Sequence, residues 1–291
     1  MLQPGADGPR IAVYSCYFGA HEPFNAAATG SDSPAYDRFV FTDHASLPSS
    51  ARLIRLEDAG EGPAILSRLP KLCPHLFFQG YDWVVYLDNN ARFLLDPARI
   101  IRRVAKEHPD TPAGRYLFRH RRRDCAWDEA DECLRLGYMT PDQHAQVTAH
   151  FTAQALPRHA GLYVNTCLVQ RMGCARTDVL NAAWYDSLTS LTRRDQVMLP
   201  WLLASHACPH RVLGAKIRAW VEWPIFSPKA RARFRRRGRA AVAPELGIER
   251  VYGVDTRQGE IDFFPFDKVQ AFESAKGIDV TDAMIAQVQA E

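Results

Sequence analysis

The sequence has no long apolar run, no large excess of charge and no paired cysteine motif. No apolar stretch approaches the ~20 residues that a membrane-spanning helix needs. The net charge of +3 is too small to indicate a nucleic-acid partner by itself. The seven cysteines include no Cys-x-x-Cys pair. We therefore predict reduced, mostly buried thiols, as in a cytoplasmic protein, and neither a disulfide framework nor a zinc knuckle.

Three further absences narrow the class of protein. Residues 1–10 are polar and contain no apolar segment, so we expect no secretion signal and a cytoplasmic location. There is no Gly-x-Ser-x-Gly sequence and no His/Cys metal cluster, which argues against a serine or zinc hydrolase. We find no internal repeat. What remains is a chain that is 47% hydrophobic and 24% charged, the balance of an ordinary globular protein with a substantial core.

Apolar strand-like segments alternate with helix-like segments along the first three quarters of the chain. The pattern predicts strands at residues 11–16, 38–43, 83–87 and 162–170. It predicts helices at residues 65–78, 96–108, 127–136, 140–155, 177–188 and 194–205. This alternation is typical of a layered α/β domain.

The most informative segment is the strand that ends at Asp88. Trp83 to Leu87 are five consecutive apolar residues, followed abruptly by Asp88, Asn89 and Asn90. Ligands of open α/β sheets bind at the carboxyl ends of the strands. A carboxylate and a carboxamide there suit a cation or a phosphate-bearing ligand. The alternative is a simple strand-end turn, for which Asp and Asn are also common.

Several short sequences, in order, resemble those of a known family of glycosyltransferase-like proteins. This family was first described in plants for pectin and mucilage synthesis, has bacterial relatives, and was long a domain of unknown function. The matching sequences span about residues 14–203. They are Arg68-Leu-Pro-Lys71 with Pro74-His75, Trp83 to Asp88 with Asp96-Pro97, Phe118-Arg-His120, Glu129-Ala130, Asn181 with Trp184-Tyr185, and Arg194-Asp-Gln196 with Pro200.

A second, broader resemblance is to retaining glycosyltransferases of the A-type fold. Tyr163 to Cys167, followed by Asp195-Gln196, is similar to their Asn-Ser-Gly…Asp-Gln pattern. The chain departs from it at Thr166-Cys167, which replaces Ser-Gly. It also carries Asn90 where the Asp-any-Asp motif of such enzymes has its second carboxylate.

These resemblances imply an A-type, Rossmann-like single domain with a central mixed, mostly parallel sheet and helices on both sides. The implied activity is transfer of a hexose-like sugar, with retention of the anomeric configuration, from a nucleotide-diphosphate sugar to a glycan or lipid-linked acceptor in surface polysaccharide synthesis. Mn²⁺ or Mg²⁺ is the implied cofactor, with Asp88 as its ligand. Asn90 is assigned to the same donor site, and His206 or His210 is a candidate for a further metal ligand.

Such a reaction needs the base, the diphosphate and the reacting sugar to be held. Candidates for the base and ribose are Tyr14 by stacking and Asp43 by hydrogen bonding, although Tyr14 is equally consistent with a strand aromatic and Asp43 with a loop cap. Candidates for the diphosphate are Arg68 and Lys71, or alternatively these form a solvated basic helix face. Candidates for the sugar and acceptor side are His120, Asn165, Asp195 and Gln196, with Arg194 holding a phosphate or orienting Asp195. Asp195 is also consistent with a plain helix-start carboxylate.

The C-terminal part differs in character from the rest. We predict a glycosyltransferase-like domain at residues 1–223 and a basic extension at residues 224–291 that packs on it. Lys229–Arg239 holds seven cations in eleven residues, which suits an anionic membrane, a lipid-diphosphate acceptor or an acidic glycan. A solvated charge run is the more common outcome. Peripheral contact with the inner face of the membrane is the functional alternative to that outcome, and nucleic acid is not expected.

Two rival functions remain open at this point. A catalytically lapsed protein that binds a nucleotide sugar or a glycan is suggested by the missing second carboxylate at Asn90. A hydrolase of a glycolipid is the other, although no nucleophile elbow supports it.

Overall fold

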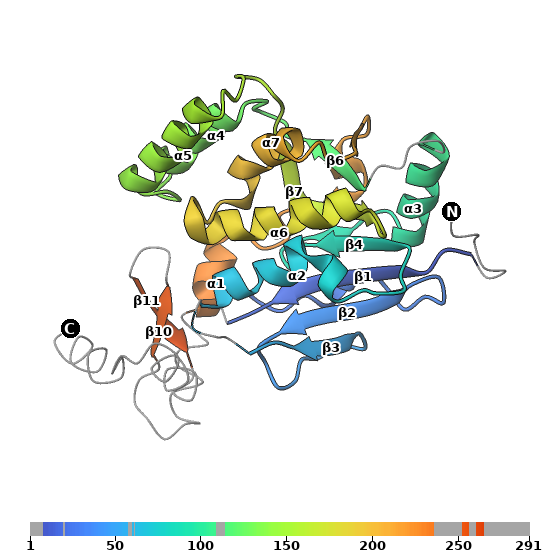
Figure 1. The fold of residues 1–291 in the computed structure, drawn as a ribbon. Coiled ribbons are helices and arrows are strands. Elements are labelled where there is room, and N and C mark those ends of the chain that lie inside the picture. Colours follow the sequence, from blue (N-terminus) through green and yellow to red (C-terminus); the bar gives the residue numbers. More distant parts are fainter. Residues whose placement is uncertain are drawn as a thin grey trace.

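The protein is built around one seven-stranded sheet (Figure 1). A computed structural model describes residues 8–19, 21–57, 60, 62–108 and 114–235, and the backbone of residues 252–255 and 260–264. The strand order is β3-β2-β1-β4-β7-β6-β8. All neighbouring pairs are parallel except those of β7 with β4 and β6. The predicted mixed, mostly parallel α/β sheet is therefore confirmed.

The predicted strands all form, and their ends shift by a residue or two. The strands of the large sheet are β1 (Ile11–Tyr17), β2 (Asp37–Thr42), β3 (Arg52–Arg55), β4 (Trp83–Leu87), β6 (Arg115–Arg119), β7 (Tyr163–Arg171) and β8 (His210–Leu213). Two small antiparallel pairs accompany it: β5 (Arg92–Phe93) with β9 (Val221–Glu222), and β10 (Tyr252–Asp255) with β11 (Glu260–Phe264).

Three strands of the large sheet were not predicted. Both β3 and β6 begin and end with arginine, and β8 begins with His210-Arg211. Their apolar runs are therefore only two or three residues long, too short to stand out in the sequence. β3 and β8 are also the two outer strands of the sheet. Outer strands commonly carry charged residues, because one of their edges is not paired with another strand.

The helices correspond closely to the predicted ones, with one exception. They are α3 (Pro97–Glu107), α4 (Ala126–Arg135), α5 (Pro141–Ala153), α6 (Ala175–Ser190) and α7 (Asp195–Ser205), with a short 3-10 turn η1 at Ala26–Thr29 and another, η3, at Ile217–Ala219. Asp96 caps α3, and Thr140 with Gln143 forms the predicted capping box of α5. The exception is residues 65–78, which form α1 (Pro63–Leu66), α2 (Arg68–Leu72) and η2 (Pro74–Leu76). Pro74 disfavours helical backbone at Cys73, so α2 stops there.

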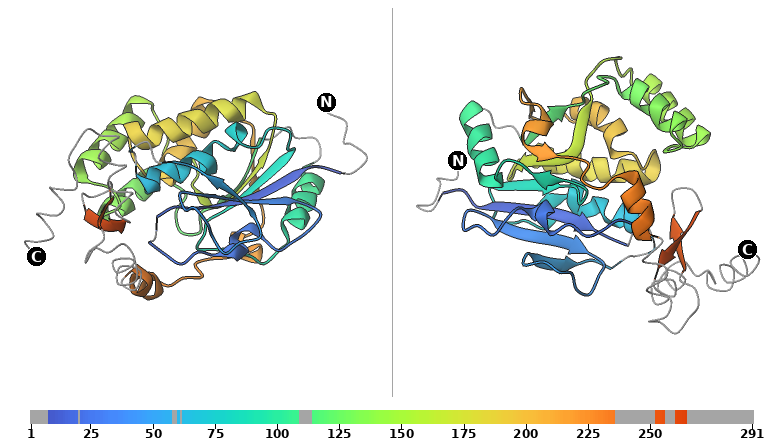
Figure 2. Two further views of the ribbon diagram at one scale, coloured as in Figure 1. Left: turned by 90° about the horizontal axis from the view of Figure 1, so that it is seen from below. Right: turned by 180° about the vertical axis from the view of Figure 1, so that it is seen from behind.

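Helices cover both faces of the sheet (Figures 1 and 2). On one face, α2, α6 and α7 pack on side chains such as Tyr14 and Tyr86. On the other face, α3 packs on Val13 and Val85. Successive side chains of a strand point to opposite faces, so β1 and β4 contribute to both cores. The helices α4 and α5 lie together beside α7 (Figure 1).

The basic extension is described only in part. Residues 228–235 are helical. Lys229, Arg233 and Arg235 on this helix are exposed. Arg231 lies 3.9 Å from Glu22. The remaining cations of the run, at positions 236–239, lie outside the described residues, and the predicted boundary at 223/224 stays a prediction. Among the residues that the structure describes, no helix is both long and apolar enough to cross a membrane.

Candidate functional site

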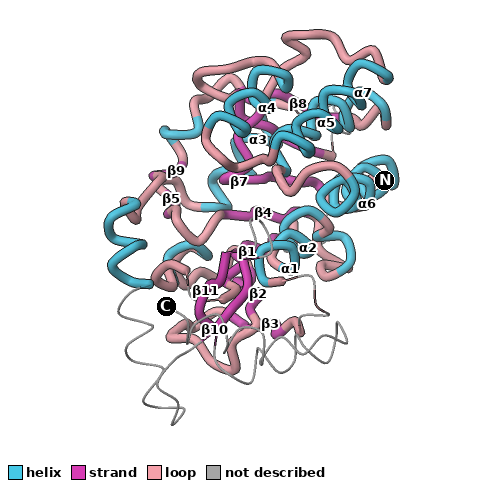
Figure 3. Tube along the Cα trace, turned by 90° about the vertical axis from the view of Figure 1, so that its left-hand side faces the viewer, coloured by secondary structure: helices cyan, strands magenta, loops and turns pink. Residues whose placement is uncertain are grey.

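The candidate site lies at the edge of the sheet where β1 and β4 end and the antiparallel β7 begins. Figure 3 looks onto this edge, with α1 and α2 beside the end of β1. The backbone N–H of Asp88 donates to the carbonyl of Thr166 at 2.9 Å, which fixes the end of β4 against the start of β7. This is the edge at which the sequence predicted ligand binding.

A buried ammonium group lies at the centre of the site. Lys71 Nζ on α2 is 3.1 Å from Asp88 Oδ1 and 3.1 Å from Asp195 Oδ2. Only 3% of Lys71 is exposed. The three residues come from a helix, a strand end and a helix start that are far apart in sequence. Burial of a lysine is costly unless it is paired, and here two carboxylates supply the pairing.

Two guanidinium groups extend this cluster. Arg68 Nε lies 4.0 Å from Asp195 Oδ2. Burial raises the pKa of the Asp195 carboxyl, but Lys71, Arg68 and Arg194 together outweigh burial and hold that pKa well below its usual range. Three cations therefore face the two carboxylates of Asp88 and Asp195, which leaves a formal net charge of +1. The site is suited to bind an anion.

Tyr86 supports the cluster from β4, a role that sequence reasoning missed. Its hydroxyl donates to Asp88 Oδ1 at 2.7 Å, and the Lys71 ammonium lies 5.1 Å from the centre of its ring. The available signal was spacing, because residues two apart on a strand face the same side. Burial, followed by the charge of Asp88, raises the pKa of Tyr86, so the hydroxyl stays protonated and remains a donor.

Tyr14 is not placed to stack on a base. Its side chain is 1% exposed and packs against the rings of Phe78 and Tyr86, with centroids 4.8 and 5.3 Å away. Its hydroxyl donates to the backbone carbonyl of Lys71 at 3.4 Å. Tyr14 is therefore an aromatic side chain buried on its strand, which was the alternative to base stacking, and its hydroxyl contacts the backbone of α2.

The start of α7 is tied to the sheet and to α6. Gln196 Nε2 donates to the carbonyl of Tyr163 at 2.6 Å, and Trp184 Nε1 donates to the carbonyl of Asp195 at 2.7 Å. These bonds position Asp195 at the first residue of α7. Arg194, at the N-cap, has its guanidinium carbon 4.8 Å from the centre of the Tyr138 ring.

Asn165 is a buried polar side chain without a partner. It is 6% exposed, and neither its Oδ1 nor its Nδ2 makes a hydrogen bond in the structure. It lies on β7 next to Thr166, whose carbonyl bonds Asp88. A buried amide without partners is expensive. An unpaired amide thus lies one residue from the backbone contact between β7 and Asp88, which makes Asn165 a candidate for binding a ligand at this edge.

Asn90 has a different partner from the one predicted. Its Oδ1 accepts from the Phe226 N–H at 2.6 Å, and its Nδ2 donates to the Phe226 carbonyl at 3.4 Å. Its backbone carbonyl accepts from Ile225. Both ends of the side chain therefore hold the segment after β9, and the assignment of Asn90 to the donor site stays a prediction.

A divalent cation does not fit the donor set at Asp88. Asp88 Oδ1 already accepts from Lys71 and Tyr86, and the amide at Asn90 is committed to Phe226. The one other carboxylate at the cluster, Asp195, shares the same ammonium group. A cation bound between the two carboxylates would lie against Lys71, whose charge it would repel.

Asp43 stabilises a loop at the neighbouring strand. Both of its carboxylate oxygens accept from the Gly19 N–H, at 3.1 and 3.3 Å. The carbonyl of Gly19 in turn lies 2.7 Å from His44 Nε2. Asp43 is 7% exposed. Its contacts are those of a loop cap, which was the alternative to hydrogen bonding with the base or ribose.

The candidate histidines lie apart from the cluster. His120 follows β6 at the same sheet edge, and its Nδ1 accepts from the Arg123 N–H at 3.1 Å. Burial lowers its pKa. The proposed metal ligands His206 and His210 are wrongly placed. His206 caps the far end of α7, an 11-residue helix that is about 16 Å long. His210 begins β8, at the opposite edge of the sheet.

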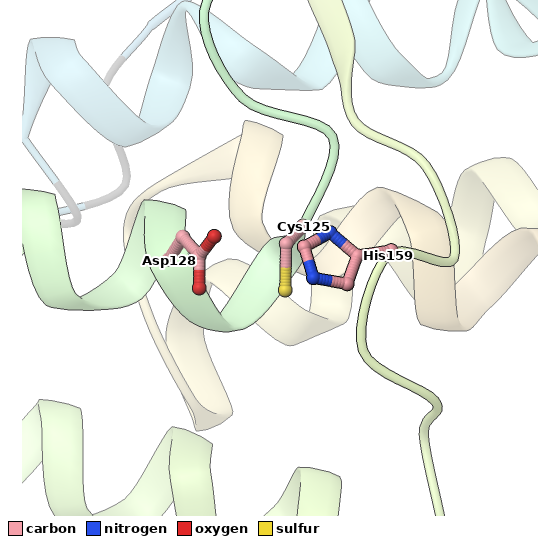
Figure 4. Close-up of side chains that lie close together, drawn as sticks. All are labelled: Cys125, Asp128 and His159. Carbon is pink, nitrogen blue, oxygen red and sulfur yellow. The ribbon is translucent and has the colours of Figure 1, made fainter.

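Another group of metal-binding residue types occurs at the start of α4 (Figure 4). Ligand atoms of Cys125, Asp128 and His159 lie within 4.8 Å of one another. Asp128 already faces Arg158 at 3.3 Å, and His159 Nδ1 faces Asp124 at 2.7 Å. The side chains of Asp128 and His159 are about half exposed or more. The structure gives this group no contact with Lys71, Asp88 or Asp195.

Comparisons with known proteins place the chain in context. A family model described as TOD1/MUCI70, glycosyltransferase-like domain, matches residues 53–209. Lys71, Asp88, Asn165 and Asp195 all lie in that range. A search of curated proteins finds no match. A solved structure that matches is the crystal structure of mouse xyloside xylosyltransferase 1, apo form. It has 11% sequence identity, a TM-score of 0.42, and coverage of 70% of this chain and 85% of that one.

Proposed function

The chain belongs to the TOD1/MUCI70 glycosyltransferase-like family, and we propose that it transfers a sugar from a nucleotide-diphosphate donor to a glycan or glycolipid acceptor. One observation carries this proposal: the buried Lys71 ammonium between Asp88 and Asp195, at the sheet edge where α/β proteins bind ligands. The excess positive charge around it complements a diphosphate.

The proposed reaction replaces one bond of the anomeric carbon with another. The acceptor hydroxyl oxygen forms a bond to the anomeric carbon of the sugar, and the bond from that carbon to the diphosphate oxygen breaks. The electron pair and the negative charge leave with the diphosphate, which also takes the proton of the acceptor hydroxyl. Lys71 and Arg68 stabilise the charge that develops on the diphosphate in the transition state. Contacts that strengthen in the transition state lower the barrier, whereas contacts that are equally strong in the ground state do not.

Asp195 is proposed to face the transferred sugar. A carboxylate with a strongly lowered pKa is a weak base, so proton abstraction suits it poorly. It remains ionised and is suited to stabilise the positive charge that builds on the anomeric carbon. This assignment agrees with the retaining outcome that the sequence resemblance implies. Asn165, with both polar atoms free, is assigned to a hydroxyl of the sugar.

Cellular placement is proposed from sequence alone. We propose a cytoplasmic protein that contacts the anionic inner face of the membrane through the basic extension. The exposed Lys229, Arg233 and Arg235 support this, since each basic residue near such a surface contributes about 1 kcal/mol. Surface polysaccharide synthesis is the proposed process. Membrane fractionation at low and high salt tests this placement, because the association should weaken as salt rises.

A thermal-shift panel of nucleoside diphosphates and nucleotide sugars is the direct test of the function. A ligand that binds only the native state raises the Tm by mass action and identifies the donor class. Slow hydrolysis of the sugar that binds, followed by transfer to candidate acceptors, then establishes turnover. Binding without any turnover would favour the lapsed glycan- or nucleotide-sugar-binding protein. A panel without any binder would refute the proposal.

A further inference from the structure

We propose that Lys71 takes the place of a divalent cation at this site, so that the diphosphate is bound and released without a metal. The inference rests on the proposed function and assigns its counter-ion. It starts from the position of the ammonium group, which lies 3.1 Å from both Asp88 Oδ1 and Asp195 Oδ2. A bridging cation between two carboxylates would occupy the same space.

The remaining donors are arranged around the ammonium group. Tyr86 donates its hydroxyl to the Asp88 oxygen that also accepts from Lys71. A metal ion at this oxygen would compete with two donors, and one at the other carboxylate oxygen of Asp88 would still lie close to the Lys71 ammonium, whose charge would repel it. Asn90, the position where an Asp-any-Asp motif has its second carboxylate, is held by Phe226 on both ends of its amide. Asn90 thus replaces the second carboxylate of the motif, and its amide is hydrogen-bonded to the backbone of Phe226.

Lys71 is also held where it is. Its side chain is 3% exposed and its backbone carbonyl accepts from the buried Tyr14 hydroxyl. Moving the ammonium group aside for a metal would require a new partner for it in the same buried region, and an unpaired buried charge is costly.

The charge around Lys71 suffices for a diphosphate without help from a metal. Arg68 lies 4.0 Å from Asp195, and its side chain is 26% exposed, so it reaches the surface of the site. Arg194 also acts on Asp195. A buried lysine supplies the point charge and the arginines supply forked donors, a combination that recognises phosphate oxygens.

Calorimetry of ligand binding in EDTA tests the inference. The ligands are inorganic pyrophosphate and whichever of UDP, GDP, ADP and CDP stabilises the protein best. We expect the same Kd in EDTA, Mg²⁺ and Mn²⁺ for the wild type. Lys71→Met should weaken pyrophosphate at least about tenfold, the loss expected for one charge-assisted hydrogen bond. Lys106→Met is the matched control, because Lys106 is exposed on α3 at the other face of the sheet.

A gain of metal binding in the variant sharpens the test. Without the ammonium group, Asp88 and Asp195 face each other with no cation between them. We expect Mn²⁺ to raise the Tm of Lys71→Met and to restore part of its pyrophosphate binding, while the wild type shows neither effect. If Lys71→Met does not fold, Lys71→Met/Asp88→Asn removes one charge of each sign from the cluster, and Lys71→Arg should retain binding in EDTA.

The outcomes separate the inference from the proposed function. Nucleotide binding that requires Mn²⁺ or Mg²⁺ in the wild type overturns the role of Lys71 and leaves the glycosyltransferase proposal standing. Equal Kd values for the wild type and Lys71→Met in EDTA also overturn it. No binding of any nucleotide or of pyrophosphate, with or without metal, refutes both.

Discussion

Two groups of side chains in this protein have the composition of a metal site, and they differ in how they are built. The group around Lys71 is buried, joins α2, the end of β4 and the start of α7, and has a cation at its centre. The group of Cys125, Asp128 and His159 lies around the start of α4. Its cysteine is buried, its aspartate half-buried and its histidine exposed, and Asp128 and His159 are already paired with Arg158 and Asp124. Residue type alone does not distinguish them.

The two groups differ in whether polar atoms or charges at the site lack a partner. Beside the Lys71 group, Asn165 is buried with two unpaired polar atoms, and three cations outnumber two carboxylates. Burying such groups without partners costs stability, so a ligand that completes them is the physical explanation. The paired side chains at the start of α4 have surface ion pairs that contribute little and need no ligand. The predictions below, from the largest expected effect to the smallest, test this comparison.

The largest effect is expected at Asp195. Asp195→Asn should lower kcat by about 10²- to 10³-fold, because the variant loses the charge that stabilises the reacting sugar. The Kd of the nucleoside diphosphate should change only a few-fold, since the diphosphate contacts remain. Single-turnover rates and calorimetry measure the two quantities. Asp186→Asn, at an exposed position of α6, is the control and should leave both unchanged. An unchanged rate in Asp195→Asn would show a helix-start carboxylate without a catalytic role.

Asp88→Asn should have a smaller effect, with kcat about tenfold lower. Lys71 keeps Asp195 as a partner, and Asn still accepts the hydrogen bond of the Tyr86 hydroxyl. A loss of more than about a hundredfold, reversed by Mn²⁺, would instead point to a metal ligand at Asp88. The comparison is made at saturating donor, so that affinity and rate are separated.

The sequence predicted at which edge of the sheet the polar side chains gather, but not which of them contact one another. Asp88 and Asp195 were found because one ends an apolar run and the other starts a helix, and both signals are local. The contacts of Tyr14 and Asn90 were not predicted because their partners, Phe78 and Phe226, are distant in sequence. The central ion pair was missed for the same reason: no local pattern places Lys71 between two carboxylates.

The seven-stranded sheet shows the same limit. The four apolar strands were predicted, whereas β3, β6 and β8 were not, since arginine or histidine interrupts each of them. Helix ends were predicted well where capping is local, as at Thr140. Residues 65–78 were not, because two prolines and tertiary packing, rather than the helical period, decide where the chain turns.

Acid should expose the contribution of Asp195 to stability. Its folded-state pKa lies below the ordinary value of about 3.9, so the ionised carboxylate stabilises the fold fully above that value. This stabilisation is lost as the pH falls through the folded-state pKa. We expect the free energy of unfolding of the wild type to fall more steeply below about pH 4 than that of Asp195→Asn. Urea titrations at several pH values measure it, and parallel curves would contradict the lowered pKa.

Asn90→Ala should affect stability more than nucleotide binding. The variant loses both side-chain bonds to the Phe226 backbone and keeps the bond from Ile225 to its own carbonyl. We expect a loss of about 1–3 kcal/mol in the free energy of unfolding and a nucleoside-diphosphate Kd within about threefold of the wild type. Urea unfolding and calorimetry test this. A Kd raised tenfold with unchanged stability would return Asn90 to the donor site.

The smallest effect is expected at the start of α4. His159→Ala should leave kcat/KM within about twofold, since His159 is exposed, does not contact the Lys71 group, and surface changes rarely exceed about 0.5 kcal/mol. Cys125→Ser should also leave kcat/KM within about twofold, because Cys125 does not contact the Lys71 group; Cys125 is buried, so the cost of placing a hydroxyl there is expected in stability. Asp124 loses only an exposed partner in His159→Ala. The sharper measurement adds Zn²⁺ or Co²⁺ to the wild type and follows metal content after dialysis, together with the thiolate–Co²⁺ absorption. We expect neither stoichiometric metal nor that band, because Asp128 and His159 already have partners. One tightly held ion that is lost in both variants would show that the group of Cys125, Asp128 and His159 binds a metal. In that case, buried polar atoms without partners would no longer distinguish a ligand-binding group from a group that binds none.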